Sequence, residues 1–258
     1  MESRWVEWVA GFPARMLEHL LPACCLLCGQ ASPQRLLCTG CDGDLPRILA
    51  CCRQCGLPSG SPAALGATRL CADCLRHPPA WDKAIAALVY EYPVDHLVRN
   101  FKFHRDMACG QLLADELVRA VLLDTAQPRP EAVHPPGSQL PDLLIPVPLH
   151  YLRRCRRGFN QAEILATELQ HALGIPLHRN LLRRIAHTPA QSGLERNARQ
   201  QNLRNAFHCI GLRGQHVALV DDVLTTGATL QECSSVLKCA GAREVSVWVA
   251  ARVPAPSQ

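Results

Sequence analysis

The chain of 258 residues is long enough for one sizeable core and a small additional unit. Its formal net charge of +5 permits an anionic partner without requiring one, and no apolar run approaches the roughly 20 residues that a membrane-spanning helix needs. Its 15 cysteines would suit a secreted disulfide-rich domain, but the N-terminal segment lacks the basic and apolar regions of a signal peptide. We therefore expect a cytoplasmic protein without membrane insertion, whose clustered cysteines bind metal.

The chain divides into three stretches of different composition. Residues 1–23 mix apolar residues with charged ones, which predicts an amphipathic docking helix. Residues 24–78 are rich in cysteine, glycine and proline and lack hydrophobic periodicity, so this segment cannot bury a large core without a staple. Residues 79–258 have the patterning of a globular domain, interrupted by a proline-rich connector at 127–141 that we expect to be exposed.

The cysteine-rich segment contains an internal repeat, because CLLCG…LLCTGC is echoed by CRQCG…RLCADC. A C-x-x-C pair places two thiolates on one tight turn, and two such turns supply the four tetrahedral ligands that zinc favours. We predict two zinc sites of this kind, formed by Cys25, Cys28, Cys38 and Cys41 and by Cys52, Cys55, Cys71 and Cys74. The repeat favours this sequential pairing, and the alternative is a cross-braced pairing of the first pair with the third. Because a closed four-thiolate site has no open position for chemistry, we expect both ions to be structural.

Strand and helix patterns alternate after residue 79. We predict strands at AIAALVYEY, DLLIPVPL, AFHCI, HVALVDD and EVSVWVAARV. The helical spacing of apolar residues predicts helices at VDHLVRNFKFH, GQLLADELVRAVLLD, NQAEILATELQHALG and ATLQECSSVLKCAGA. Strands that alternate with helices favour an α/β fold with a mainly parallel sheet and helices on both of its faces.

The predicted strand HVALVDD ends in two carboxylates, Asp221 and Asp222, and a small hydroxyl-rich turn follows it. In open α/β sheets, ligands bind beyond the carboxyl ends of the strands, and a helix N-terminus with free backbone amides binds phosphate. Carboxylates beside a phosphate site are expected if the ligand also carries vicinal hydroxyls and a divalent metal, as a ribose 5-phosphate with further phosphates does. The alternative is a helix cap, which explains one aspartate better than two.

These residues carry a resemblance to a known family. The segment VALVDDVLTTGATL resembles the phosphoribosyl-pyrophosphate-binding motif of type I phosphoribosyltransferases. Together with the repeated CxxCG…LCxxC, LPRI, FKFHRD, LIPVPLHYLRRCRRGFNQAEILA and AQSGLERNARQQNLRNAF, it is similar to the ComF family, also called GntX-like or competence proteins F. The similarity extends from about Cys25 to Val253 and implies a double zinc ribbon followed by a type I phosphoribosyltransferase-like domain.

The resemblance implies a role for each part of the acidic segment. Asp221 and Asp222 would hold the ribose hydroxyls, partly through Mg²⁺. The 5-phosphate would be bound by Thr225, Thr226, Gly227, Ala228 and Thr229. Purine-salvage members of the superfamily carry an acidic residue that can act as a base where this chain has Thr225, which speaks against that chemistry and leaves the acceptor unspecified.

Two further segments are assigned by the same resemblance. The pyrophosphate loop would lie at RRGFNQ, with Arg157, Gly158 and Asn160 as its binding residues. A flexible lid is expected around residues 191–199, with Gln191 and Arg196 as its candidate residues. We expect the arginines to stabilise the leaving pyrophosphate and the lid to exclude water.

Basic residues interleaved with aromatic ones support a second hypothesis. HYLRRCRRGF contains Arg153, Arg154 and Arg156, and NFKFHRD alternates Lys102 with phenylalanines, a pattern that suits single-stranded DNA. Two functions are therefore open. The first is a magnesium-dependent phosphoribosyltransferase with an unknown acceptor, and the second is a non-catalytic single-stranded DNA-binding module that retains the phosphoribosyl pocket. The link of the resembled family with DNA uptake raises the second, and the oligomeric state stays open.

Overall fold

The computed structural model describes residues 24–33, 35–61, 65–66, 69–126, 140–149, 155, 157–185 and 206–255. The chain forms two compact units, Met1–Leu45 and Pro46–Gln258. The predicted N-terminal helix, residues 127–139 of the proline-rich connector and the predicted lid lie outside the described residues.

The described part of the first unit is built around its cysteines. An isolated bridge joins Cys24 to Ala31, and the backbone amide of Cys25 donates to the carbonyl of Gln30 at 2.8 Å. The short helix α3 (Thr39–Gly43) follows Cys38, whose thiol accepts a hydrogen bond from the amide of Cys41. These contacts close small loops, as expected for a segment that has little hydrophobic core of its own.

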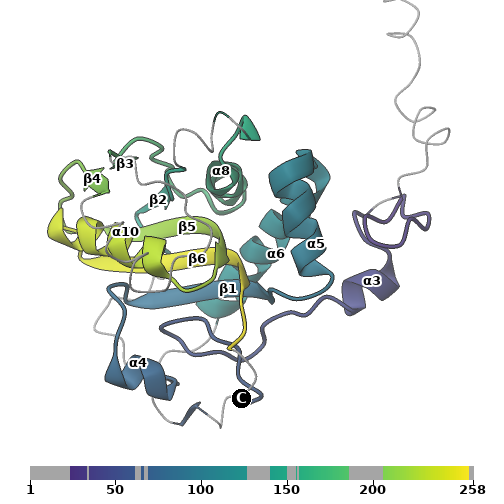
Figure 1. Cartoon of the computed structure of the whole chain (residues 1–258), viewed down its shortest axis with the longest axis horizontal. Helices are drawn as coiled ribbons and strands as arrows, with labels where there is room; N and C mark the ends of the chain where they lie inside the picture. The colour runs from purple at the N-terminus through teal and green to yellow at the C-terminus, as the bar shows by residue number, and fades with distance from the viewer. Residues whose placement is uncertain are drawn as a thin grey trace, which may run out of the picture. The chain divides into compact units, whose positions relative to one another are not determined.

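The second unit is organised around a four-stranded parallel sheet in the order β1-β6-β5-β2 (Figure 1). The strands are β1 (Lys83–Val89), β2 (Leu143–Pro146), β5 (His216–Leu224) and β6 (Glu244–Arg252). The two long central strands pair in register from His216 opposite Glu244 to Leu224 opposite Arg252. Most of their residues are buried, which is typical of parallel strands covered on both faces.

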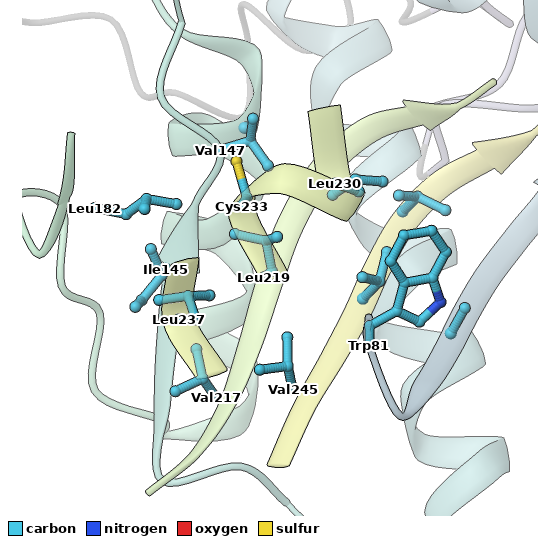
Figure 2. Packing of buried hydrophobic residues seen from close by; sticks show 14 of the residues in the cluster. Trp81, Ile145, Val147, Leu182, Val217, Leu219, Leu230, Cys233, Leu237 and Val245 are labelled. Carbon is cyan, nitrogen blue, oxygen red and sulfur yellow. The ribbon is translucent and has the colours of Figure 1, made fainter. Parts of the chain in front are cut away.

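Helices cover both faces of this sheet. The helices that cover it are α6 (Met107–Thr125), α8 (Gln161–Leu173) and α10 (Ala228–Cys239). The same unit also contains the shorter helices α4 (Ala72–Arg76) and α5 (Val94–Arg99) and the π-helix η2 (Asn100–His104). Figure 2 shows Leu230 and Leu237 of α10 packed over Val217, Leu219 and Val245 of the central strands. The other face is covered by α6 on β1 and β6 and by α8 on β2 and β5. The predicted parallel α/β fold is therefore confirmed.

Two details of the sequence prediction were wrong. The strand predicted to end at Asp222 continues to Leu224, because Val223 and Leu224 still pair with β6, so both aspartates lie inside the strand. The predicted strand AFHCI exists as β4 (Phe207–Cys209), but it pairs antiparallel with the unpredicted strand β3 (Leu182–Arg184) in a separate two-stranded sheet. The basic sequence LRR has too few apolar residues to indicate a strand without its partner.

Candidate functional site

The structure brings together the four thiols of each predicted metal set. Within each set the sulfur atoms lie within 4.8 Å of one another, and the sets are Cys25, Cys28, Cys38 and Cys41, and Cys52, Cys55, Cys71 and Cys74. The thiols are thus grouped in the sequential arrangement. We refer to them as the first and the second cysteine cluster.

The chemistry of both clusters fits Zn²⁺. Burial opposes the ionisation of Cys25, but the backbone amides of Cys28, Cys38 and Leu27 lower its pKa to about 6. A hydrogen bond from Cys55 lowers the pKa of Cys52 to about 4 in spite of burial. The hydrogen bonds between the thiols in turn raise the pKa of Cys41, through Cys28, and of Cys55, through Cys52, so without a metal ion the charge of each cluster is shared. Thiolates held by backbone amides are the ligands that zinc prefers, and four of them complete its tetrahedral shell.

The predicted ligand-binding residues come from two loops at the same edge of the sheet. β5 carries Asp221 and Asp222, which we call the acidic pair, and continues directly into residues 224–229, which we call the phosphate loop. β2 leads toward the predicted pyrophosphate loop at residues 157–160. Because β2 and β5 are parallel, their carboxyl ends lie at one edge, where ligands of open α/β sheets bind.

The acidic pair lies near the carboxyl end of β5. Asp222 is buried, and its Oδ2 forms an ion pair with Lys102 Nζ at a distance of 3.0 Å. Asp221 Oδ1 accepts a hydrogen bond from the amide of Asp222 at 2.9 Å. Burial and the charge of Asp222 raise the pKa of Asp221 to about 7, and Lys102 and Arg157 partly oppose this rise.

Sequence reasoning did not connect Lys102 with the acidic pair and placed it among the residues of a nucleic-acid surface. The π-helix η2 directs Lys102 toward Asp222, while its neighbour Phe101 is fully buried and contacts Phe159 at a centroid distance of 5.5 Å. A Cβ atom on Gly110 would lie only 2.6 Å from the ring of Phe101, so close packing against α6 holds η2 in place. Only the presence of Lys102 within the FKFHRD motif hinted at this role.

The predicted pyrophosphate loop contacts the end of η2. The carbonyl of Arg157 accepts from Arg105 Nε at 3.1 Å, and the Arg157 guanidinium lies 5.2 Å from the ring centroid of Phe103. Gly158 has φ +82°, and a Cβ atom there would lie 2.8 Å from the Arg105 guanidinium. A larger residue at Gly158 would therefore be strained and would displace Arg105.

Asn160 has a structural position within this loop. Its side-chain oxygen accepts from the amide of Ala162 at 3.2 Å and caps α8, while its Nδ2 donates to the carbonyl of Val147 at 3.0 Å. Both ends of the amide are thus engaged, and they join the loop to the residue that follows β2. These two hydrogen bonds join the loop to both the end of β2 and the start of α8.

The phosphate loop turns into the N-terminus of α10 at Gly227, which has φ +78°. No side chain of the described residues caps this helix end, and Thr225 and Thr226 are exposed beside it. The first amides of a helix have no partner within the helix, and with the helix dipole they form an anion site. Ala228 and Thr229 form its first turn and are half-buried.

Some predicted residues cannot be placed. Gln191 and Arg196 of the predicted lid, and Arg153, Arg154 and Arg156 of the predicted nucleic-acid surface, lie outside the described residues.

Of the residues that are described, the structure brings together the acidic pair, Lys102 and Arg157 at the sheet edge that carries the phosphate loop. Among the helices of the described ranges, none combines the length and apolarity needed to cross a bilayer.

The chain is similar in sequence to known proteins over most of its length. Residues 155–257 match a family model described as "Phosphoribosyl transferase domain". The chain is 37% identical to competence protein F of Haemophilus influenzae over 220 residues, covering 84% of this chain and 90% of that protein. It is 34% identical to the DNA utilization protein YhgH of Salmonella typhi over 235 residues, covering 90% and 98%.

The likeness to solved structures is weaker. A purine phosphoribosyltransferase from Pyrococcus horikoshii is 18% identical, with a TM-score of 0.30, and the matched region covers 67% of this chain and 82% of that one.

Proposed function

Because the chain belongs to the family of competence protein F, we propose that its phosphoribosyltransferase domain binds phosphoribosyl pyrophosphate with Mg²⁺ in the cytoplasm. The observation that carries this proposal is the acidic pair inside β5, followed by a glycine turn into the N-terminus of α10, which no side chain of the described residues caps. Carboxylates suit ribose hydroxyls and a divalent cation, whereas free helix amides suit phosphate.

Each side of the site has a part in the proposed binding. Backbone amides and hydroxyls of the phosphate loop bind the 5-phosphate, and the acidic pair binds the ribose diol together with Mg²⁺. Arg157 and Lys102 supply the positive charge for the pyrophosphate group. Without ligand, Lys102 Nζ lies 3.0 Å from Asp222 Oδ2 and offsets the negative charge of that carboxylate. The two adjacent aspartates are therefore not two negative charges without a nearby cation.

The reaction that this arrangement supports is displacement of pyrophosphate from the anomeric carbon by an acceptor. Positive charge from Arg157 and Lys102 would stabilise the negative charge that develops on the leaving group. Mg²⁺, when bound, would supply further charge stabilisation on the pyrophosphate oxygens. The relatives are named for competence and DNA utilization, and we propose that this chain likewise serves DNA uptake or the use of external DNA.

Calorimetry tests the binding step directly. Phosphoribosyl pyrophosphate should bind in the presence of Mg²⁺ and bind much more weakly in chelator. Turnover is tested by pyrophosphate release against a panel of acceptors that includes nucleobases and single-stranded DNA. Equal affinity with and without divalent cation would contradict the assigned role of the acidic pair.

A second candidate function is a non-catalytic module that binds single-stranded DNA. It is favoured by Phe103, which is 58% exposed although it is a large aromatic residue, and which has the Arg157 guanidinium over its ring. Exposed rings beside arginines are typical surfaces for stacked bases. DNA binding that weakens with salt and with Phe103→Ala, without pyrophosphate release from any acceptor, would select this function over the enzyme.

We propose that each cysteine cluster holds one structural zinc ion. The support is the grouping of four thiols within 4.8 Å of one another in each cluster, which matches the tetrahedral ligand set of zinc. Elemental analysis of metal-replete protein should give two zinc ions per chain. A value near one would remove one of the two sites from the proposal.

A further inference from the structure

The turn that carries the first half of the second cysteine cluster is hydrogen-bonded to the phosphoribosyltransferase domain through its carbonyl groups. We call residues 52–56 the second cysteine turn. The carbonyl of Gln54 accepts from Trp81 Nε1 at 2.5 Å, and that of Cys55 accepts from Arg252 Nε at 3.1 Å. A third carbonyl, that of Arg53, accepts from the first strand of the sheet through the amide of Ala84 at 3.0 Å.

The side chains of Arg252 and Trp81 also contact the phosphate loop. Arg252 Nη1 donates to the carbonyls of Leu224 and Thr225 at 3.0 and 2.8 Å. Trp81 is buried, and a Cβ atom on Gly227 would lie 3.0 Å from its ring. One guanidinium and one indole therefore connect the cysteine turn with both ends of the bend that leads into α10.

These contacts determine the direction of the loop amides. Holding the carbonyls of Leu224 and Thr225 fixes the peptide planes at the start of the loop, and at its end the indole of Trp81 occupies the space that a side chain on residue 227 would need. A binding site whose donors are already oriented does not lose free energy to ordering them when the ligand arrives. The cysteine turn supplies two of the four thiols of its cluster, and we expect it to be ordered when a metal ion holds all four together, because metal binding and folding are one event in such small sites.

We propose that the second cysteine cluster is a metal-dependent support for the phosphate loop, with Arg252 and Trp81 as the positioning residues that connect the two. The proposal rests on the function proposed above and adds that loss of one particular metal ion weakens the binding of phosphoribosyl pyrophosphate. The first cluster belongs to the separate N-terminal unit, Met1–Leu45, and provides a matched control with the same ligand chemistry.

The central experiment compares Cys55→Ser with Cys28→Ser. Each variant should lose one zinc ion per chain by elemental analysis. Cys55→Ser should weaken the binding of phosphoribosyl pyrophosphate with Mg²⁺ by about tenfold or more, because the loop donors lose their orientation, whereas Cys28→Ser should leave it within about twofold. Hydrogen exchange of amides 224–229, measured without ligand, should become faster in Cys55→Ser alone.

Two further variants keep the test valid if Cys55→Ser fails to fold. Trp81→Phe retains a ring beside Gly227 but removes the hydrogen bond to Gln54, and Arg252→Ala removes both of its connections. Both variants should retain two zinc ions per chain. They should nevertheless bind phosphoribosyl pyrophosphate more weakly than the wild type, and the amide hydrogens of residues 224–229 should exchange faster. Arg252→Lys, which preserves the charge and one donor group, should recover part of the affinity lost in Arg252→Ala.

The outcomes separate this inference from the proposed function. If the wild-type protein does not bind phosphoribosyl pyrophosphate, the proposed function fails, and the exchange of residues 224–229 still tests the connection. If the wild type binds and Cys55→Ser, Trp81→Phe and Arg252→Ala bind equally well, the inference is overturned while the function stands. Unchanged exchange in Cys55→Ser after confirmed loss of its zinc would overturn the inference in either case.

Discussion

The phosphate loop and the acidic pair adjoin each other along β5, yet the first is built from backbone and the second from side-chain charge. The loop depends on the conformation of Gly227, at φ +78°, and on the first backbone amides of α10, which no side chain of the described residues caps. The acidic pair depends on Lys102, which reaches Asp222 from a π-helix far away in the sequence. Changes to the loop should therefore act through shape, and changes to the pair should act through charge and pH.

The largest effect is expected for the loop, from Gly227→Val. The valine would need a left-handed backbone, which costs about 1–2 kcal/mol, and its Cβ would lie 3.0 Å from Trp81. Phosphoribosyl pyrophosphate binding should fall by about 100-fold or more, or about 2.7 kcal/mol by calorimetry. Gly214→Val is the matched control, because Gly214 has φ +77° but open space around it, and it should lose stability without losing affinity. Equal losses of affinity in both variants would contradict a specific role for the loop.

A smaller loss is expected when the acidic pair is replaced by Asp221→Asn and Asp222→Asn together. The asparagines preserve the shape of the site but remove the charge that attracts Mg²⁺. Affinity in Mg²⁺ should fall by between about tenfold and 100-fold, to the value that the wild type shows in chelator. Titrations of both proteins with and without divalent cation would check this, and a variant that still responds to Mg²⁺ would place the metal elsewhere.

Lys102→Met should show how much the acidic pair depends on its cation. Asp222 would keep a buried charge without this partner, which should lower the free energy of unfolding by roughly 1–2 kcal/mol in urea titrations, since the side chains of Lys102 and Asp222 are 19% and 10% exposed. Adding Asp222→Asn to Lys102→Met should recover most of this loss. If the stability losses of Lys102→Met and Asp222→Asn add in the double variant, the two side chains are not energetically coupled across their 3.0 Å ion pair.

The smallest effect should appear in the pH dependence of binding. Because the pKa of Asp221 is raised to about 7, its carboxyl is largely protonated at pH 6 and largely ionised at pH 8. Affinity for the ligand with Mg²⁺ should rise by about tenfold over this range and then level off, with proton release on binding below pH 7. Asp221→Asn should flatten the profile, and an unchanged profile would assign the titration to another group.

The raised pKa of Asp221 affects stability in the opposite direction: ligand affinity should rise with pH, whereas the contribution of Asp221 to the stability of the fold should fall. The folded protein binds the proton of Asp221 more tightly than the unfolded chain, so this group stabilises the fold most below the ordinary pKa of an aspartate. That contribution is lost as the pH rises through about 7. Compared with the wild type, Asp221→Asn should therefore become relatively more stable as the pH rises from 4 to 8 in thermal unfolding experiments.

Much of the fold could be predicted because its signals are local. Apolar runs alternating with helical patterns predict parallel strands and covering helices, and the sheet has this arrangement. The sequence pattern predicted that β5 ends at Asp222, whereas the strand continues to Leu224. The length of a strand depends on how far its neighbour pairs with it, and β6 pairs with β5 as far as Leu224. The strand β3 was missed because its three residues, LRR, form a strand only through pairing with β4.

The sequence by itself determined where the C-x-x-C turns and the phosphate loop lie in the chain, because each is formed by neighbouring residues. The glycine that follows the first C-x-x-C pair of each repeat and the run TTGAT indicate thiolate turns and a phosphate-binding turn by residue type alone. Only the tertiary structure decided which charges meet. The packing of η2 brings Lys102 to Asp222, and the register of β5 and β6 places Arg252 opposite Leu224, beside the phosphate loop. Such contacts depend on how distant segments align in the folded sheet, which no local pattern specifies.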